Sequence, residues 1–133
     1  MVPIDSNVLL DILGGDEAWA VWSAAAVAAA AESDLLVINA IIYGEISVHY
    51  SSMEALDAAL PQAVFQREPI PFAAGFLAGK AYAAYKRRGG SKTSPLPDFL
   101  IGAHAAVAGH TLLTRDAKRY RTYFPKLGLI APD

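Results

Sequence analysis

Along the chain, short apolar runs alternate with longer segments in which apolar residues recur at helical spacing. Residues 34–39, Asp-Leu-Leu-Val-Ile-Asn, form a short apolar run bounded by polar residues, which is typical of a buried strand. Further short strands are predicted in four segments: residues 2–4, 63–65, 111–114 and 127–131. These segments supply four or five strands.

Helices are predicted between these strands. The alanine-rich stretch from Asp16-Glu17 to about Ala31 favours a long helix, because alanine has the highest helix propensity. A short helix precedes it, with Ser6 or Asn7 as its cap and Gly14-Gly15 as its end. The other helices are expected at residues 40–50, 53–60, 72–87 and 98–108, with a loop over residues 89–97.

Strands that alternate with helices favour right-handed βαβ crossovers, and therefore an α/β fold with a parallel sheet covered by helices. In open sheets of this kind the functional crevice lies beyond the carboxyl ends of the strands. Polar residues at strand ends, or on the helices that follow, are therefore the candidates for a functional site.

Composition limits the classes of protein that this chain can represent. With 133 residues, 54% of them hydrophobic and 18% charged, it can bury the core of one domain, expected over residues 1–133. The lack of cysteine excludes a disulfide scaffold, a thiolate zinc site and a cysteine nucleophile. No signal peptide is recognisable, and no apolar run reaches the roughly 20 residues of a membrane span. A soluble, cytoplasmic protein without a membrane segment is expected.

Charge is distributed unevenly, although the net charge is only −2. Residues 1–79 carry ten acidic residues and one basic residue, whereas residues 80–126 carry ten basic residues and two acidic ones. A basic half favours an anionic partner such as nucleic acid. The overall pI near 5.9 argues against a generic histone-like binder.

Four carboxylates fall where such a sheet forms its site. Asp5 ends the first apolar segment, and Asp116 follows a strand after one residue. Glu45 lies about one and a half turns into a helix, and Asp98 opens another. All four can converge at one edge of the sheet. Asp5 and Asp98 could instead be helix caps, whereas Glu45 is harder to explain structurally, because apolar residues surround it on its helix.

Converging carboxylates repel one another and persist only with protons or cations among them. Mg²⁺ and Mn²⁺ prefer oxygen ligands, whereas zinc prefers His and Cys. Divalent ions neutralise a phosphodiester and lower the pKa of bound water. The four acids therefore indicate divalent-metal phosphoryl hydrolysis.

Four segments resemble, in order, the motifs of PIN-domain ribonucleases: Ile4-Asp5-Ser6-Asn7-Val8-Leu9-Leu10, Gly44-Glu45-Ile46, Pro97-Asp98-Phe99-Leu100-Ile101 and Leu112-Leu113-Thr114-Arg115-Asp116. No single motif is specific, but the ordered Asp, Glu, Asp and Asp set is, with 18 residues from Asp98 to Asp116. The chain length and the ending Tyr120-Arg121-Thr122-Tyr123-Phe124-Pro125 are most similar to VapC-type toxins of bacterial type II toxin–antitoxin modules.

This resemblance implies a three-layer α/β/α sandwich, usually dimeric, that cleaves RNA with Mg²⁺ and is held in check by a cognate antitoxin. Mn²⁺ is expected to substitute for Mg²⁺. The catalytic, metal-binding acids map onto Asp5, Glu45, Asp98 and Asp116, one of which, Asp116 or Glu45, would help to position or deprotonate the attacking water. Small polar residues that orient these acids map onto Ser6, Asn7 and Thr114. The RNA target stays open.

Two clusters contain most of the basic residues. The first lies around the end of the helix at residues 72–87, where attraction to the helix macrodipole can explain cations such as Lys86 and Arg87. The second adjoins Asp116, where an RNA backbone would pass. Phosphate contact is therefore predicted for the residues of the second cluster: Arg115, Lys118, Arg119 and Arg121.

The remaining candidates favour structural roles. Trp19 and Trp22 are three residues apart and share a helix face, which favours a core or dimer-interface position. His104 and His110 have no second His or Cys at ligand spacing and are interpreted as structural.

Two other functions stay open. One is a phosphatase of the haloacid dehalogenase type, which requires a second Asp two residues after the nucleophilic Asp. Position 7 is Asn, which disfavours this alternative. A non-enzymatic alternative is a nucleic-acid-binding regulatory module that acts with an antitoxin on operator DNA. The presence of all four acids argues against that alternative.

Overall fold

The computed structural model describes residues 1–90 and 96–132, and within them five parallel strands form the central layer. β1 (Val2–Pro3), β2 (Leu36–Ile38) and β3 (Phe65–Arg67) pair in parallel, as do β4 (Thr111–Leu113) and β5 (Gly128–Ile130). A parallel bridge between Ile4 and Leu113 joins the two groups. The strand order is therefore β3-β2-β1-β4-β5, and the predicted parallel sheet is confirmed.

Pro3 explains why the join between β1 and β4 is so short. On the β2 side, the N–H groups of Val2 and Ile4 donate to Leu35 and Val37. On the β4 side, Asp5 donates to Leu113 at 2.9 Å, but Pro3 has no N–H to donate. One hydrogen bond of the ladder is therefore missing at the centre of the sheet.

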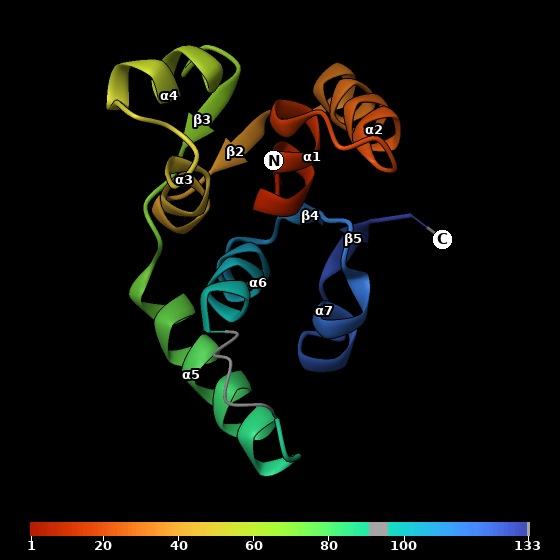
Figure 1. Cartoon of the computed structure of the whole chain (residues 1–133). Helices are drawn as coiled ribbons and strands as arrows, with labels where there is room; N and C mark the ends of the chain where they lie inside the picture. Colours follow the sequence, from red (N-terminus) through yellow and green to blue (C-terminus); the bar gives the residue numbers. More distant parts are fainter. Residues whose placement is uncertain (91–95, 133) are drawn as a thin grey trace.

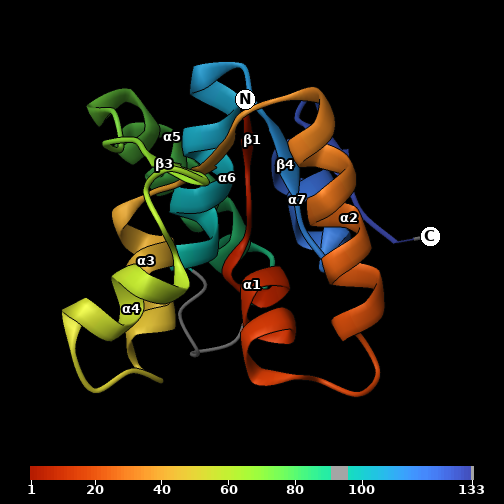
Figure 2. The same cartoon turned by 90° about the horizontal axis from the view of Figure 1, so that it is seen from above.

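Helices cover both faces of the sheet, which confirms the three-layer α/β/α arrangement. α1 (Ser6–Gly14) and α2 (Ala20–Ser33) lie on one face, and α5 (Phe72–Arg87), α6 (Leu96–Ala108) and α7 (Ala117–Tyr123) lie on the other (Figures 1 and 2). α3 (Ala40–Ser47) and α4 (Met53–Ala59) flank the β3 side of the sheet, where α3 packs against both α1 and α6. No helix among the described residues has the length and apolar character needed to cross a membrane.

Several predicted boundaries are wrong in an informative way. Asp5 caps α1, as the alternative for this residue allowed, because its side chain accepts the Ser6 N–H, and Ser6 and Asn7 lie inside the helix. α6 begins at Leu96, so Asp98 lies in the first turn of the helix instead of opening it. Pro97 is tolerated there because the first N–H groups of a helix have no helical partner. Of the predicted loop, residues 91–95 lie outside the described residues.

Helix α7 was not predicted, and Gly102 shows how it is held. A Cβ atom at Gly102 would lie 2.7 Å from the Phe124 ring and 2.9 Å from the Tyr120 ring. Both aromatic side chains are buried in the core. The missing side chain on α6 therefore lets α7 approach closely and brings its residues to the carboxyl edge of the sheet.

Candidate functional site

Asp5 lies at the carboxyl end of β1 and is only 3% exposed. Its Oδ1 atom accepts the Ser6 N–H at 2.8 Å. Its Oδ2 atom accepts two hydroxyl groups, from Thr114 at 2.8 Å and Tyr120 at 2.9 Å. Burial raises the pKa of Asp5 from 3.8 to about 6, and the nearby Asp98 charge adds to this against the lowering effect of the hydrogen bonds. Asp5 is a buried carboxyl group held by three donors.

Glu45 reaches the same edge from α3. Its Oε1 atom accepts the Ser6 hydroxyl at 2.8 Å, so Ser6 links Asp5 and Glu45 through its N–H and its hydroxyl. Partial burial raises the pKa of Glu45, and the charge of Asp98 raises it further. The apolar neighbours of Glu45 on its helix, Ile42 and Ile46, are both buried.

Asp98 faces an arginine across the site. Its Oδ2 atom accepts Arg119 Nη1 at 2.6 Å. Burial nevertheless raises the pKa of Asp98, and the charge of Asp116 opposes the stabilising effect of Arg119. The predicted phosphate-binding residue Arg119 thus neutralises an acid of the site in this structure.

Asp116 follows β4 at the N-cap position of α7, without capping it through its side chain. Its N–H donates to the Thr114 hydroxyl at 3.1 Å, and that hydroxyl donates in turn to Asp5. The fold thus brings all four predicted acids to one edge of the sheet. Among the described residues, however, no three of these acids place ligand oxygens within 4.8 Å of one another.

The donor set fits a hard divalent cation better than zinc. Among the described residues, the side chains that donate hydrogen bonds to these acids are the hydroxyls of Ser6, Thr114 and Tyr120 and the Arg119 guanidinium. Carboxylate oxygens are the ligands that Mg²⁺ and Mn²⁺ prefer. Asp5, Glu45, Asp98 and Asp116 are therefore the residues that could hold such an ion.

The orienting residues are partly as predicted. Ser6 and Thr114 donate hydrogen bonds to acids of the site. Asn7 instead accepts the backbone N–H of Arg115 at 3.2 Å, and in the described part of the chain its side chain has no hydrogen bond to an acid. Tyr120 was missed as a site residue, although its buried hydroxyl donates to Asp5. Its position four residues after Asp116, about one helical turn on, is a sequence signal that could have suggested it.

Arg115 lies apart from the other predicted phosphate-binding residues. Its Nε and Nη2 atoms donate to the buried Asp11 at 2.8 and 3.0 Å. Its guanidinium also lies 5.0 Å from the centre of the Trp19 ring, which in turn meets Trp22 edge to face. Arg115 therefore fastens the turn after β4 to α1 and α2.

The two basic clusters of the sequence meet in space. Arg88, at the end of α5, lies 5.5 Å from the Tyr123 ring of α7, and Arg119 of α7 lies 5.8 Å from the Tyr85 ring of α5. Next to them is a cleft of about 340 Å³ with these lining residues: Asp116, Lys118, Arg119, Thr122 and Tyr123. A cation of each cluster thus lies against an aromatic ring of the other helix, and Lys118 and Arg119 line the same cleft as Asp116.

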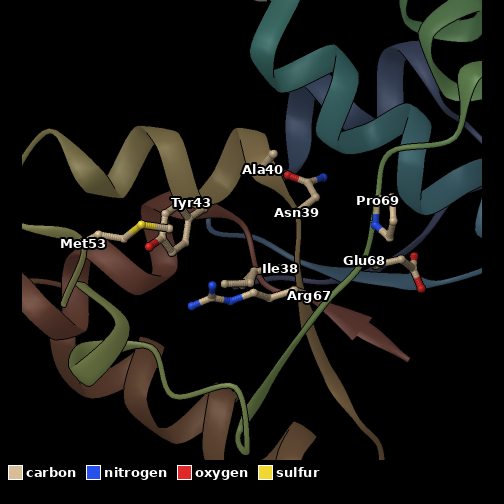
Figure 3. Close-up of a pocket in the computed structure, with 8 residues that line it drawn as sticks. All are labelled: Ile38, Asn39, Ala40, Tyr43, Met53, Arg67, Glu68 and Pro69. Carbon is tan, nitrogen blue, oxygen red and sulfur yellow. The ribbon is translucent and has the colours of Figure 1, made fainter. Parts of the chain in front are cut away.

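A second polar cluster joins residues that the sequence analysis treated separately. His104 and His110, interpreted as structural because neither has a second His or Cys at ligand spacing, both place Nε2 on Glu68 Oε1, at 2.7 and 2.8 Å. Asn39 contacts His104 from the other side. Figure 3 shows Asn39 and Glu68 at one end of a cavity of about 340 Å³, with Tyr43 at its other end. Local spacing could not reveal this cluster, because 36 residues separate Glu68 from His104.

Comparison with known proteins relates the whole fold to one family. The PIN-domain profile matches residues 2–125. No curated protein is significantly similar in sequence. Among solved structures, VapBC2 of Rickettsia felis bound to a promoter DNA fragment has a TM-score of 0.73 and 19% identity, with both chains covered completely.

Two further solved structures are similar over nearly the full length. VapBC-1 of nontypeable Haemophilus influenzae has a TM-score of 0.73 and 18% identity, with 98% of each chain covered. A toxin–antitoxin complex of Klebsiella pneumoniae has a TM-score of 0.64 and 21% identity, with 100% of this chain and 98% of that chain covered. At these identities the similarity establishes the fold.

Proposed function

Since this chain belongs to the PIN-domain family, we propose that it is a Mg²⁺-dependent endoribonuclease and the toxin of a type II toxin–antitoxin module. PIN domains are generally nucleases that act on nucleic acid. The observation that carries the proposal is the convergence of four carboxylates at one sheet edge, where burial and mutual repulsion raise the pKa of Asp5, Glu45 and Asp98. Such a site gains from a bound cation.

In this proposal Asp5, Glu45, Asp98 and Asp116 hold the ion. When bound, a divalent ion neutralises the phosphodiester and lowers the pKa of water. Tyr120 and Thr114 fix the carboxylate of Asp5, and Ser6 fixes Glu45. Glu45 or Asp116 positions the attacking water or takes its proton, since neither is held by an arginine as Asp98 is.

The proposed RNA path follows the exposed face of α7. Lys118, Arg119 and Arg121 contact phosphates, and the cleft that contains Asp116 and Lys118 leads the strand to the acids. Arg115 contributes by holding the turn through Asp11. Arg119 exchanges its bond to Asp98 for a phosphate when RNA arrives, because both partners are anions within its reach.

Protein partners are part of the same proposal. The similar structures from R. felis, H. influenzae and K. pneumoniae are VapBC or toxin–antitoxin complexes, and we extend a cognate antitoxin to this chain. Exposed aromatic side chains on α5, Phe72 at 99% and Phe76 at 70%, support a covering partner or a second copy in a homodimer. We place the protein in the cytoplasm, where its RNA substrate is found.

The test is cleavage of single-stranded RNA by the purified protein with Mg²⁺ or Mn²⁺ and with chelator. Asp98→Asn keeps the shape of the side chain but removes its charge, so cleavage should be lost. Glu32→Gln, which neutralises an exposed acid on α2, is the matched control and should cut at the parental rate. Parental cleavage by Asp98→Asn would refute the site assignment. If the unaltered chain cuts no RNA, the regulatory module on operator DNA becomes the better description.

A further inference from the structure

The second polar cluster contains a chain of hydrogen bonds whose direction can be assigned. The backbone N–H of Ile42 donates to Asn39 Oδ1 at 3.0 Å, as part of the N-cap of α3. This leaves the Asn39 NH₂ group facing His104 Nδ1, at 3.0 Å. Because an NH₂ group only donates, His104 Nδ1 must be the acceptor. The proton of the neutral ring therefore sits on Nε2, which donates to Glu68.

This position of the His104 ring proton argues against a metal site that the distances alone would suggest. Glu68, His104 and His110 have ligand atoms within 4.8 Å of one another, which would suit a transition metal. A metal on His104 Nε2 would require the proton on Nδ1, directly against the Asn39 NH₂ group. Turning the Asn39 amide to accept that proton would remove the cap of α3. The cluster is therefore a hydrogen-bonded tie between helices.

The tie occupies a defined place in the packing of α3 against α6. These helices contact each other, and Asn39 at the start of α3 meets His104 on α6. Six residues after Asn39 lies Glu45, and six residues before His104 lies Asp98. Midway between them lie Ile42 and Ile101, which are both buried. The helices thus run antiparallel, with the Asn39–His104 contact at one end and two acids of the site at the other.

We propose that Asn39 and His104 are positioning residues, which set the register of α3 against α6 and so the separation of Glu45 from Asp98. The proposal rests on the function assigned above to these two acids. A slip of one residue between the helices moves a side chain by about 1.5 Å along the axis and turns it to another direction. Functional groups must be held within about 0.5 Å, so even part of such a slip would disturb ion binding.

Both residues are suited to this role by their burial. Asn39 is 4% exposed and His104 is 2% exposed, and no buried side-chain polar atom among the described residues lacks a partner. Water therefore cannot replace either partner without a rearrangement. Glu68 fixes the far side of the His104 ring, and His110 supports Glu68 without touching α3 in this network.

The test separates register from general stability. Asn39→Ser keeps an N-cap oxygen but no longer reaches His104, and His104→Leu removes the same hydrogen bond from the other helix. His110→Leu is the matched control, because it removes a bond to the same Glu68 oxygen but leaves the tie intact. Mn²⁺ affinity is measured by calorimetry and the unfolding midpoint by circular dichroism. We expect the first two variants to bind Mn²⁺ roughly tenfold more weakly or worse, and His110→Leu to bind within about twofold of the parent.

A second measurement follows the register without metal. The chain has no cysteine, so Val48→Cys and Val107→Cys place one spin label beside each helix at exposed positions. Asn39→Ser should shift the label distance by about 1–2 Å or broaden its distribution, and His110→Leu should not. An unchanged distance in Asn39→Ser, or an equal change in His110→Leu, would overturn the proposal. Failure of the parent to bind Mn²⁺ would count against the proposed function, while the label distance would still decide the register.

Discussion

Helix α6 contributes to two polar clusters that differ in how their charges are matched. At its first turn, Asp98 lies with three other acids, and the Arg119 guanidinium donates a hydrogen bond to Asp98. Further along the same helix, His104 joins Glu68 and His110, where one carboxylate accepts from two imidazoles. Burial raises the pKa of Asp5 in the first cluster. Burial also acts to raise the pKa of Glu68, but the bonds from His110 and His104 outweigh it and lower that pKa.

This difference in charge indicates which cluster needs a ligand. The acid cluster has more negative charge than its donors can neutralise, so it is unstable as a set of ionised groups, and we propose that a cation stabilises it. The histidine cluster satisfies its members internally and gains nothing from an ion. Proximity of ligand atoms alone would have chosen the wrong cluster, since only the histidine group brings three of them within 4.8 Å among the described residues.

The largest expected effect is the pH dependence of the stability that the acid cluster contributes. The folded protein keeps the proton of Asp5 to about pH 6, whereas the unfolded chain loses it near pH 3.8. The folded state is stabilised by keeping this proton. That stabilisation is complete below pH 3.8 and is lost as the pH rises to about 6, which changes the free energy of unfolding by about 3 kcal/mol. Denaturant unfolding in chelator should show that Asp5→Asn is more stable than the parent at pH 7 but not at pH 4. The same difference in stability between Asp5→Asn and the parent at both pH values would contradict the raised pKa of Asp5.

Metal binding should change the free energy of unfolding by a similar amount. Mn²⁺ at a hundredfold excess over Kd should stabilise the parent by about 2.7 kcal/mol, because it binds only the folded chain. Asp98→Asn should show a smaller shift in unfolding midpoint, and Glu68→Gln should keep the parental shift. If Glu68→Gln loses the shift and Asp98→Asn keeps it, the ion binds at the histidine cluster.

Neutralising one acid in each cluster should change stability in opposite directions. Glu68→Gln turns two charge-assisted hydrogen bonds into neutral ones and should lower the free energy of unfolding by about 1 kcal/mol. Asp98→Asn relieves repulsion by Asp116 and should raise the metal-free midpoint at pH 7. Thermal melts in chelator measure both. A lower midpoint for Asp98→Asn would mean that its bond to Arg119 outweighs the repulsion.

The smallest expected effect concerns the cations beside the acids. Replacing Lys118 or Arg121 by Met should reduce the slope of log Kd against log salt for single-stranded RNA by about 0.7 for each phosphate that is no longer neutralised. The binding is measured in chelator so that no cleavage occurs. Lys80→Met, which alters a cation lying over Phe76 on α5, is the control and should leave the slope unchanged. Equal effects at Lys80 and Lys118 would indicate unspecific attraction.

The sequence predicts the sheet and the edge where the acids meet, because short apolar runs and the residues that follow them are local signals. Asp5 and Asp116 follow strands, and Glu45 stands out among apolar neighbours. Helix α7 is not predicted from the sequence because few of its seven residues are apolar. Its position depends on the packing of Tyr120 against Gly102, which the local sequence does not show.

The polar contacts that decide the roles of individual residues depend on long-range packing. Glu68, the residue after β3, meets His104 and His110 only in the folded chain, where 36 and 42 residues separate them, and Asp11 binds Arg115 across 104 residues. Asn39 could be expected to cap a helix, but nothing in its neighbourhood indicates that its amide holds His104. Such partnerships have no fixed spacing in the sequence.

The missing N–H of Pro3 also bears on how the molecule opens. Between β1 and β4 the backbone ladder is reduced, and the side-chain bonds from Thr114 and Tyr120 to Asp5 cross the same seam. Ionisation of Asp5 therefore alters the hydrogen bonds that join the two halves of the sheet, in addition to the cation binding proposed for this residue. The N–H groups of Asp5 and Thr111 donate across this seam, to Leu113 at 2.9 Å and to Met1 at 3.4 Å. In hydrogen–deuterium exchange these two amides should report separation along the seam, and a ligand at the acids should slow their exchange.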